Sequence, residues 1–280
     1  MRLISFLRPD GTASYGTTDG TTVFDAGAEL SGTYADLRGV LTADAVAALK
    51  GCGPKLALDE VTLQSPVPNP DKILCIGLNY LSHIKETGRD KPTYPSIFTR
   101  YPSSLLGHGV PLVRPKVSDK FDYEGELAVI IGKTCRHVST DVAWDVIAGY
   151  SCFNDGSIRD YQVHTTQFWP GKSFEASGSM GPWIATPDEV GDITKQTLTT
   201  RIDGNVEQEA GIDDLAITIP EIIAYLSQIL TLLPGDVIAT GTPGGVGRFR
   251  EPQLYLEPGM TAEIEITGIG TLSNGVVDEA

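Results

Sequence analysis

Two glutamates one residue apart stand just before an apolar run, and their spacing suggests a metal site. Glu124 and Glu126 lie in the stretch FDYEGELAVIIGK, directly ahead of the apolar residues 127–131. Alternate side chains of a strand point to the same face, so the two carboxylates would lie side by side. Like charges this close repel each other unless a positive group lies between them. Asp155 ends a second apolar stretch, VIAGYSCFND, and adds a third carboxylate if the two strands are neighbours.

Three carboxylates at one end of a core would suit a hard divalent cation. Mg²⁺, Mn²⁺ and Ca²⁺ prefer oxygen ligands and leave positions for water and substrate, whereas zinc more often recruits histidine or cysteine. The alternative interpretation is that Glu124 and Glu126 are solvated residues at a strand end. The spacing alone favours that alternative, because the Glu-x-Glu pattern is common.

A histidine and a glutamate form a second candidate group. His83 and Glu86 lie three residues apart in GLNYLSHIKETG, where a short helix is predicted to end at Gly88. This spacing places both side chains on one helix face. A carboxylate beside an imidazole fixes its tautomer and raises its basicity, which suits a general base acting on water. Taken alone, the pair is more simply an exposed surface contact.

Two cations and a glycine-rich loop follow the candidate metal ligands. In RDYQ, Arg159 and Gln162 lie one turn apart, and Lys172 comes soon after them. Positive groups near a metal suit a carboxylate substrate or a developing oxyanion, although most lysines simply keep a surface soluble. The loop TGTPGGVG, residues 240–247, allows close backbone approach to a ligand. It lacks the Lys-Ser or Lys-Thr of a Walker loop, and a plain turn is the alternative.

Short strands with few helices must position these residues. Residues 1–65 alternate apolar pieces with turn residues, and the proline-rich residues 65–72 are interpreted as a linker. We therefore expect a small N-terminal domain, residues 1–65, and a main catalytic domain, residues 66–280. The pattern indicates a β-rich, mixed α/β fold rather than a doubly wound one. Asp203-Gly204 marks a hairpin turn, and a helix with Pro220 in its first turn is predicted to bury Ile222, Ile223, Leu226, Ile229 and Leu230.

The composition is that of a soluble globular protein. The chain has 280 residues, and 21 basic against 36 acidic residues give a formal charge of −15. This average field repels nucleic acids and acidic membranes, but a local cation would still admit a small anionic substrate. The four cysteines include no Cys-x-x-Cys pair, which favours reduced thiols. The polar N-terminus and the lack of an apolar run near ~20 residues predict a cytoplasmic location.

Taken together, these motifs resemble the fumarylacetoacetate hydrolase family. The resemblance implies a rolled, mixed β-sheet of sandwich-like or barrel-like form with one divalent cation at its mouth. That ion would usually be Mg²⁺ or Mn²⁺, with Ca²⁺ also able to bind in vitro, and the protein would be a homodimer. The resemblance covers residues 70–275 through GLNYLSHIKE, FDYEGELAVIIGK, FNDGSIRDYQ, GKSFEASGSMGPW, IPEIIAYLSQILTLLPGDVIATGTPGGVG and LEPGMTAEIEITGIGTLSN, in that order.

By position, the resemblance implies a role for each candidate residue. His83 and Glu86 match the family's water-activating dyad, and Lys172 matches a residue that stabilises the developing oxyanion. The implied metal ligands are Glu124, Glu126 and Asp155. The implied substrate contacts are Tyr80, Arg100, Arg159, Gln162 and Thr242.

Arg100 departs from the family pattern, because many members carry lysine at this position. A guanidinium can hold a carboxylate through two parallel hydrogen bonds, so Arg100 is expected to bind an additional substrate carboxylate. Tyr101 and His108 are expected to shape the same pocket. Gly156 and Ile158 replace a valine and an alanine that the family usually carries, and neither change removes a ligand or the dyad.

The implied reaction is hydrolysis of a carbon–carbon bond in a β-diketo acid. An acylpyruvate, a fumarylpyruvate or a 2,4-dioxo sugar acid would yield pyruvate and a carboxylic acid, in the catabolism of an aromatic compound or a sugar acid. The family also includes metal-dependent decarboxylases, isomerases and tautomerases of related 2-oxo acids such as oxaloacetate, and these are the alternative. A non-catalytic metabolite-binding protein is a third interpretation, and the intact dyad argues against it.

Overall fold

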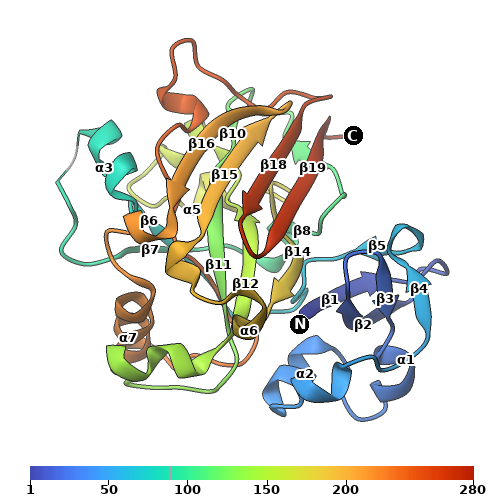
Figure 1. The fold of residues 1–280 in the computed structure, drawn as a ribbon. Coiled ribbons are helices and arrows are strands. Elements are labelled where there is room, and N and C mark those ends of the chain that lie inside the picture. Colours follow the sequence, from blue (N-terminus) through green and yellow to red (C-terminus); the bar gives the residue numbers. More distant parts are fainter. Residues whose placement is uncertain (89) are drawn as a thin grey trace.

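The structure is a computed structural model of the chain, and it describes residues 1–88 and 90–280. Its strands form mixed sheets that are not closed into a barrel (Figure 1). The β-rich, mixed α/β fold class predicted from the sequence is therefore confirmed. In the described part of the chain, no helix has the length and apolar character needed to cross a membrane.

One large mixed sheet runs through the molecule. Its strands are β1 (Arg2–Leu7), β2 (Ala13–Thr18), β3 (Thr22–Phe24), β4 (Lys55–Ala57), β5 (Thr62–Leu63), β6 (Ile73–Gly77), β7 (Ser96–Thr99), β8 (Leu105–Leu106), β11 (Gly125–Ile131), β12 (Ile147–Asn154), β14 (Gly178–Ala185) and β17 (Val237–Ala239). Their order is β4-β3-β2-β1-β14-β12-β11-β17-β6-β7, with β5 added to β1 and β8 to β14. The β17–β6 and β14–β8 pairs are parallel, and the other neighbours named here are antiparallel.

A second sheet covers β11 and β12 (Figure 1). Its strands are β9 (Leu112–Arg114), β15 (Thr197–Ile202), β16 (Asn205–Gly211), β18 (Thr261–Ile266) and β19 (Gly270–Asp278), in the order β16-β15-β18-β19-β9. The predicted hairpin at Asp203-Gly204 is confirmed, since it joins β15 to β16 and both residues have positive φ. Leu127 of β11 and Ile264 of β18 belong to one hydrophobic cluster, so the main core lies between the two sheets.

Strand β11 is buried on both faces, which explains its continuous apolar sequence. Leu127 and Val129 belong to the cluster beneath the second sheet. Ala128 and Ile130 point the other way and belong to a cluster shared with the N-terminal region. Glu126 is two residues before Ala128, so its side chain points to the same face of the strand as Ala128 and Ile130. A core strand therefore carries a carboxylate into the interior.

Short helices lie around the sheets. The predicted helix is α7, which begins after Thr218 with a capping box to Glu221. Leu226 is buried as expected, but Ile229 is 56% exposed because it is the last residue of the helix. The α-helices are α1 (Gly27–Leu30), α2 (Leu37–Thr42), α3 (Leu81–Thr87), α4 (Arg159–Gln162), α5 (Trp169–Lys172), α6 (Pro187–Val190) and α7 (Ile219–Ile229). Short 3₁₀ helices lie at Val46–Leu49, Leu58–Glu60, Pro102–Ser104, Thr140–Val146, Ile193–Lys195, Ile212–Asp214 and Gly247–Phe249, and β10 (Phe121–Asp122) pairs with β13 (Ser157–Ile158).

The N-terminal region continues the large sheet. Its strand β1 hydrogen-bonds to β14, and Figure 1 shows this blue region beside β14. Leu3 of β1 and Leu37 of α2 share a hydrophobic cluster with Ile73 and Phe153. The division of the chain into residues 1–65 and 66–280 stays a prediction.

Candidate active site

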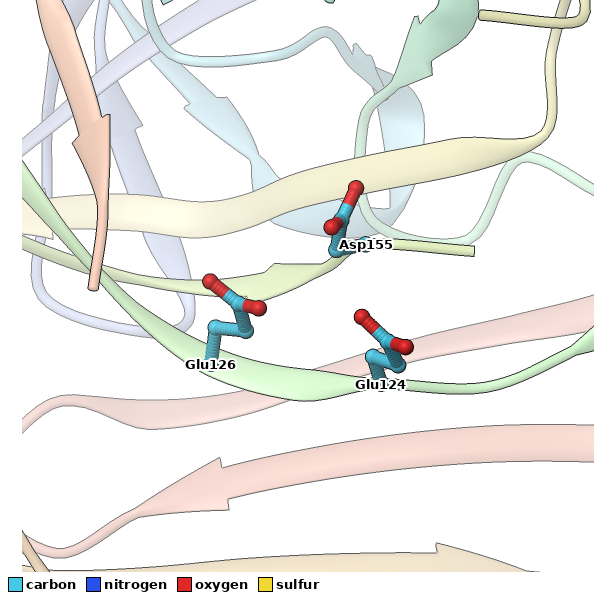
Figure 2. Close-up of side chains that lie close together, drawn as sticks. All are labelled: Glu124, Glu126 and Asp155. Atoms are coloured by element: carbon cyan, nitrogen blue, oxygen red, sulfur yellow. The ribbon is translucent and has the colours of Figure 1, made fainter. Parts of the chain in front are cut away.

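Glu124, Glu126 and Asp155 lie together in the protein interior (Figure 2). One oxygen from each carboxylate lies within 4.8 Å of the corresponding oxygens of the other two. The three residues are buried, with exposed fractions of 6%, 2% and 0%. The convergence of three carboxylates is therefore present, and their role as metal ligands stays a prediction.

The pairing of β11 with β12 brings these carboxylates together. Gly125 pairs with Asn154, and the Asp155 N–H donates to the Glu124 carbonyl oxygen at 2.9 Å, just beyond the ends of both strands. Gly125 separates the two glutamates because the second sheet leaves no room for a side chain there. A Cβ atom on Gly125 would lie 2.0 Å from Thr200 Oγ1. The Glu-Gly-Glu order thus serves both the cluster and the packing of the sheets.

Two buried cations neutralise part of the cluster. Lys172 Nζ donates to Glu124 Oε2 at 2.5 Å and to Asp155 Oδ2 at 2.6 Å. Arg159 donates from Nη1 to Glu124 Oε1 at 2.6 Å and from Nε to Asp122 Oδ2 at 2.7 Å. Burial alone would raise the pKa of Glu124, but the charges of Lys172 and Arg159 lower it to about 2. Glu124 is therefore held in its ionised form.

Asp122 is a site residue that the sequence reasoning missed. Its carboxylate is fully buried and accepts the Gly247 N–H at 2.8 Å and the Arg248 N–H at 2.9 Å, besides its bond from Arg159. It therefore ties the end of the glycine-rich loop to the acidic cluster. The Asp-x-Glu-x-Glu alternation, which gives the three side chains the same parity, is the sequence signal that could have found it.

Glu126 is the carboxylate of the cluster that lacks a cation. Among the described residues no Lys, Arg or His lies within ion-pair distance, and Glu126 Oε2 accepts the Gly241 N–H at 2.8 Å. Burial and the negative charges of Asp155 and Glu124 raise its pKa well above the usual range. Within the described part of the chain, the acidic cluster therefore has no positive group beside Glu126, where the oxygens of three carboxylates converge. The residues present fit a divalent cation such as Mg²⁺, Mn²⁺ or Ca²⁺.

Metal affinity is expected to fall as the pH is lowered. Glu126 keeps its proton up to a higher pH than an ordinary carboxyl group, and metal binding must displace that proton. Below the raised pKa, each pH unit should lower the affinity about tenfold, and above it the affinity should level off. Titration calorimetry with Mg²⁺ in buffers of different ionisation enthalpy measures the protons released. Binding without proton release, in the range where affinity changes with pH, would contradict this.

His83 and Glu86 lie on one face of α3, as their spacing predicts. His83 Nδ1 is 2.9 Å from Glu86 Oε2, and Glu86 Oε1 accepts the Gly245 N–H at 3.0 Å. Burial alone would raise the pKa of Glu86, but these two hydrogen bonds outweigh it and lower the pKa. An ionised Glu86 fixes the imidazole through Nδ1 and leaves Nε2 for chemistry. The helix ends at Gly88, which has φ of 67° as the predicted stop.

A cavity of about 160 Å³ is lined by two carboxylates of the acidic cluster and by the histidine of the dyad. Its wall includes Glu124, Glu126, His83, Arg159 and Lys172. This volume is below the roughly 300 Å³ of a typical drug-sized pocket, so the cavity suits a small metabolite. The sequence reasoning missed the other lining residues, which are Ile76, Gly77, Leu78, Phe98, Val163, Phe168, Arg248 and Phe249.

Thr242 and Gln162, two of the predicted substrate contacts, also line the cavity. Thr242 Oγ1 donates to the Gly125 carbonyl oxygen at 2.9 Å and accepts from Gln208 Nε2 at 2.8 Å. Its hydroxyl proton is therefore already used within the protein. Gln162 Oε1 accepts from Arg159 Nη1 at 3.0 Å, which leaves its amide N–H groups for a ligand. The substrate roles of both residues stay predictions.

Arg100 is not among the residues that line the cavity, and its predicted substrate role stays a prediction. Its side chain is fully buried, and Nη1 donates to Asp155 Oδ1 at 2.6 Å and to the Gly156 carbonyl oxygen at 2.9 Å. Nη2 donates to Ser177 Oγ at 2.9 Å. Arg100 is thus a counter-ion of Asp155 inside the protein.

Tyr80, Tyr101 and His108 also lie outside the cavity wall. Tyr80 is completely buried in the core between the sheets, and its backbone forms a β-bridge with Leu215. Tyr101 is 55% exposed and stacks edge-on against Trp169. His108 Nδ1 accepts the N–H of Ser273, and its side chain lines a different hollow. The predicted roles of these three residues at the substrate pocket stay predictions.

Arg100→Ala is expected to destabilise the metal-free protein by about 3–5 kcal/mol, since it leaves part of the buried Asp155 charge uncompensated. Urea unfolding in chelator measures this loss. The matched control is Arg114→Ala, because Arg114 pairs with Asp278, whose side chain is 58% exposed. That substitution should cost at most about 1 kcal/mol. Equal losses in the free energy of unfolding would show that the buried Arg100–Asp155 pair stabilises the protein no more than the exposed Arg114–Asp278 pair.

A family model identifies the class of protein to which this site belongs. The model described as "Fumarylacetoacetate (FAA) hydrolase C-terminal" matches residues 72–277. The chain therefore belongs to the fumarylacetoacetate hydrolase family, as its motifs suggested. Among its relatives, "Oxaloacetate tautomerase YisK" of Bacillus subtilis (strain 168) is 41% identical over 224 residues, which are 79% of this chain and 74% of the relative.

Solved structures share the fold over the whole chain. Fumarylacetoacetate hydrolase from psychrophilic Exiguobacterium antarcticum superposes with a TM-score of 0.89 at 34% identity, covering 100% of both chains. Maleylpyruvate hydrolase from Sphingobium sp. SYK-6, in complex with manganese (II) ion and pyruvate, gives a TM-score of 0.81 at 29% identity, again covering 100% of both chains. The expected family fold is therefore confirmed, and relatives on this fold carry the names of different reactions.

Proposed function

We propose that this protein interconverts the keto and enol forms of oxaloacetate, or of a closely related 2-oxo acid, using a divalent cation. The observation that carries the proposal is the 41% identity to an oxaloacetate tautomerase over 79% of the chain. The cavity supports it, because Glu124 and Glu126 of the acidic cluster and His83 of the His–Glu pair line one small space. Tautomerisation, the alternative in the sequence analysis, thus takes precedence over carbon–carbon bond hydrolysis.

Arg159 offers the cavity a hydrogen-bond donor. We assign Glu124, Glu126 and Asp155 as ligands of the cation, which would supply Lewis-acid polarisation of the 2-oxo acid when bound. Arg159 Nη2 is buried and has no hydrogen-bond partner among the described residues. It can therefore donate to the oxygen that becomes negative when C3 loses a proton.

Lys172 contributes charge rather than a free donor. Its Nζ donates to Glu124 Oε2, to Asp155 Oδ2 and to the Asp155 carbonyl oxygen, so its three N–H groups are engaged. We therefore propose that Lys172 positions Glu124 and Asp155 and adds positive charge beside the substrate. The direct stabilisation of an oxyanion, which the sequence analysis expected of it, falls instead to Arg159.

His83 is the proton carrier in this proposal. Glu86 holds Nδ1, so His83 Nε2 takes the proton from C3 of the keto form. Protonation of the resulting negative oxygen, from the imidazolium or from water, gives the enol, and the reverse path restores the keto form.

Hydrolysis of an acylpyruvate is the second candidate. The His83–Glu86 pair could equally activate a water molecule for attack on a carbonyl. The similar fold of the maleylpyruvate hydrolase favours keeping this candidate. We further propose Mg²⁺ or Mn²⁺ as the physiological ion, a cytoplasmic location and a homodimer, on ligand chemistry and family membership.

Product analysis separates these candidates. Chelator-treated protein is reloaded with Mg²⁺ or Mn²⁺ and incubated with oxaloacetate and, separately, with acetylpyruvate. Metal-dependent keto–enol interconversion of oxaloacetate without pyruvate formation supports the tautomerase. Carbon dioxide from oxaloacetate would identify a decarboxylase, and pyruvate plus acetate from acetylpyruvate would identify a hydrolase. Tight binding without turnover of either compound would favour a metabolite-binding protein.

A further inference from the structure

We propose that Arg248 recognises the second carboxylate of a dicarboxylic 2-oxo acid, and so selects four-carbon dicarboxylates over their monocarboxylic counterparts. This inference rests on the proposed function, because it assumes that the first carboxylate and the 2-oxo group lie at the acidic cluster. Arg248 takes the role predicted for Arg100, because the Arg100 guanidinium is already paired with the Asp155 carboxylate.

The other cations of the cavity are already paired with protein carboxylates. Lys172 is 2% exposed and bridges Glu124 and Asp155. Arg159 is 5% exposed and bridges Asp122 and Glu124. The unpaired donor that remains on Arg159 is Nη2, which the proposed function assigns to the oxygen of the 2-oxo group. The distal carboxylate of the substrate therefore requires a different positive group.

Arg248 is the unpaired cation of the cavity wall. Arg248 is half-buried and lines the same cavity as Glu124, Glu126 and His83. Among the described residues, no carboxylate lies within ion-pair distance of its guanidinium and no acceptor is hydrogen-bonded to it. Its guanidinium lies over the ring of Phe249, whose centroid is 5.9 Å from the guanidinium carbon. The guanidinium thus has its five donors available for a ligand.

The backbone at Arg248 is fixed to the acidic cluster. Asp122 accepts the Gly247 N–H at 2.8 Å and the Arg248 N–H at 2.9 Å through its two oxygens. The same carboxylate accepts Arg159 Nε at 2.7 Å, and Arg159 in turn holds Glu124. The backbone from which the Arg248 side chain extends is therefore tied to Glu124 through Asp122 and Arg159.

The chemistry of the site matches a small dicarboxylate. The cavity of about 160 Å³ limits the ligand to a few carbon atoms. A carboxylate and a 2-oxo group would occupy the acidic end through the cation, and a planar guanidinium can hold the other carboxylate by two parallel hydrogen bonds. A monocarboxylic analogue would leave Arg248 unpaired, which makes this residue a determinant of specificity.

Binding of two non-reacting 2-hydroxy acids to the Mg²⁺-loaded protein tests the inference. Malate carries the distal carboxylate, and 2-hydroxybutanoate carries a methyl group in its place. Wild type should prefer malate, and Arg248→Gln should weaken malate binding roughly 10- to 100-fold while leaving 2-hydroxybutanoate unchanged, as expected for a hydrogen-bonded charge pair. The KM for oxaloacetate should rise by a similar factor. The control Arg201→Gln, which removes an arginine paired with Glu265 on the second sheet, should change neither ligand.

The outcomes separate this inference from the proposed function. Equal affinity of wild type for the two hydroxy acids, or equal weakening of both by Arg248→Gln, would overturn the role of Arg248. A malate preference that Arg248→Gln removes, together with no tautomerisation of oxaloacetate by wild type, would uphold Arg248 as a dicarboxylate receptor. That second result would reject the proposed reaction alone.

Discussion

Glu126→Gln is expected to lose divalent-metal binding and, with it, the metal-dependent reaction. Even partners that only orient metal ligands contribute about 10- to 100-fold to affinity, so loss of a carboxylate ligand should cost on the order of 100-fold or more. Glutamine keeps the shape and can still accept the Gly241 N–H. Titration calorimetry with Mg²⁺ and Mn²⁺ measures the loss.

The same substitution should leave the metal-free fold as stable as wild type or make it more stable. The pKa of Glu126 is raised, so the folded state binds more protons than the unfolded state above the ordinary carboxyl range. Wild type without metal therefore loses stability as the pH rises through that window, and the neutral amide does not. Urea unfolding in chelator at several pH values tests this sign.

Glu209→Gln is the matched control for the Glu126 substitution. It removes one carboxylate from an exposed position on β16 and should change neither metal affinity nor the pH dependence of unfolding. Undiminished metal binding by Glu126→Gln would show that the acidic cluster is not the metal site. Strong destabilisation by Glu126→Gln at high pH in chelator would contradict the assigned repulsion between carboxylates.

His83→Asn is expected to lower kcat by about 10²- to 10⁴-fold, the usual contribution of a general base. Metal affinity should stay near that of wild type, because His83 belongs to α3 and not to the acidic cluster. Steady-state kinetics with oxaloacetate and a parallel Mg²⁺ titration separate the two effects. Exchange of deuterium into C3 should fall by the same factor as kcat.

His137→Asn is the control for the loss of an imidazole. His137 is exposed and has φ of 55°, a conformation that asparagine adopts readily. This variant should retain full activity. If His83→Asn keeps wild-type kcat and C3 exchange, His83 is not the proton carrier.

Strand alternation made part of the site predictable. Glu124 and Glu126 share a face because they are two residues apart, and β11 carries the continuous apolar sequence of a strand buried on both faces. The His83–Glu86 pair follows equally directly from helical spacing and from a glycine stop. In these cases the partners are close in sequence, so a local period determines the contact.

Contacts between distant segments were not predictable in the same way. Arg100 looked like a substrate receptor, but its guanidinium meets Asp155, 55 residues further along the chain. The sequence around Arg248 has no helical or strand periodicity that would mark it as a site residue. Whether its guanidinium is paired depends on which carboxylates the fold brings near it. The pairing of β1 with β14 likewise joins residues of the predicted N-terminal domain to the main sheet. Such pairings depend on tertiary packing, which a single sequence does not encode locally.

The most direct test of the central claim is the rate at which oxaloacetate reaches its keto–enol equilibrium, followed by the ultraviolet absorbance of the enol. The rate is measured for wild type after chelator treatment and again after reloading with Mg²⁺. The same two measurements are made with Glu126→Gln. The proposed function predicts acceleration by the Mg²⁺-loaded wild type alone. Equal rates for the stripped protein or for Glu126→Gln, or no acceleration by the loaded wild type, would contradict it.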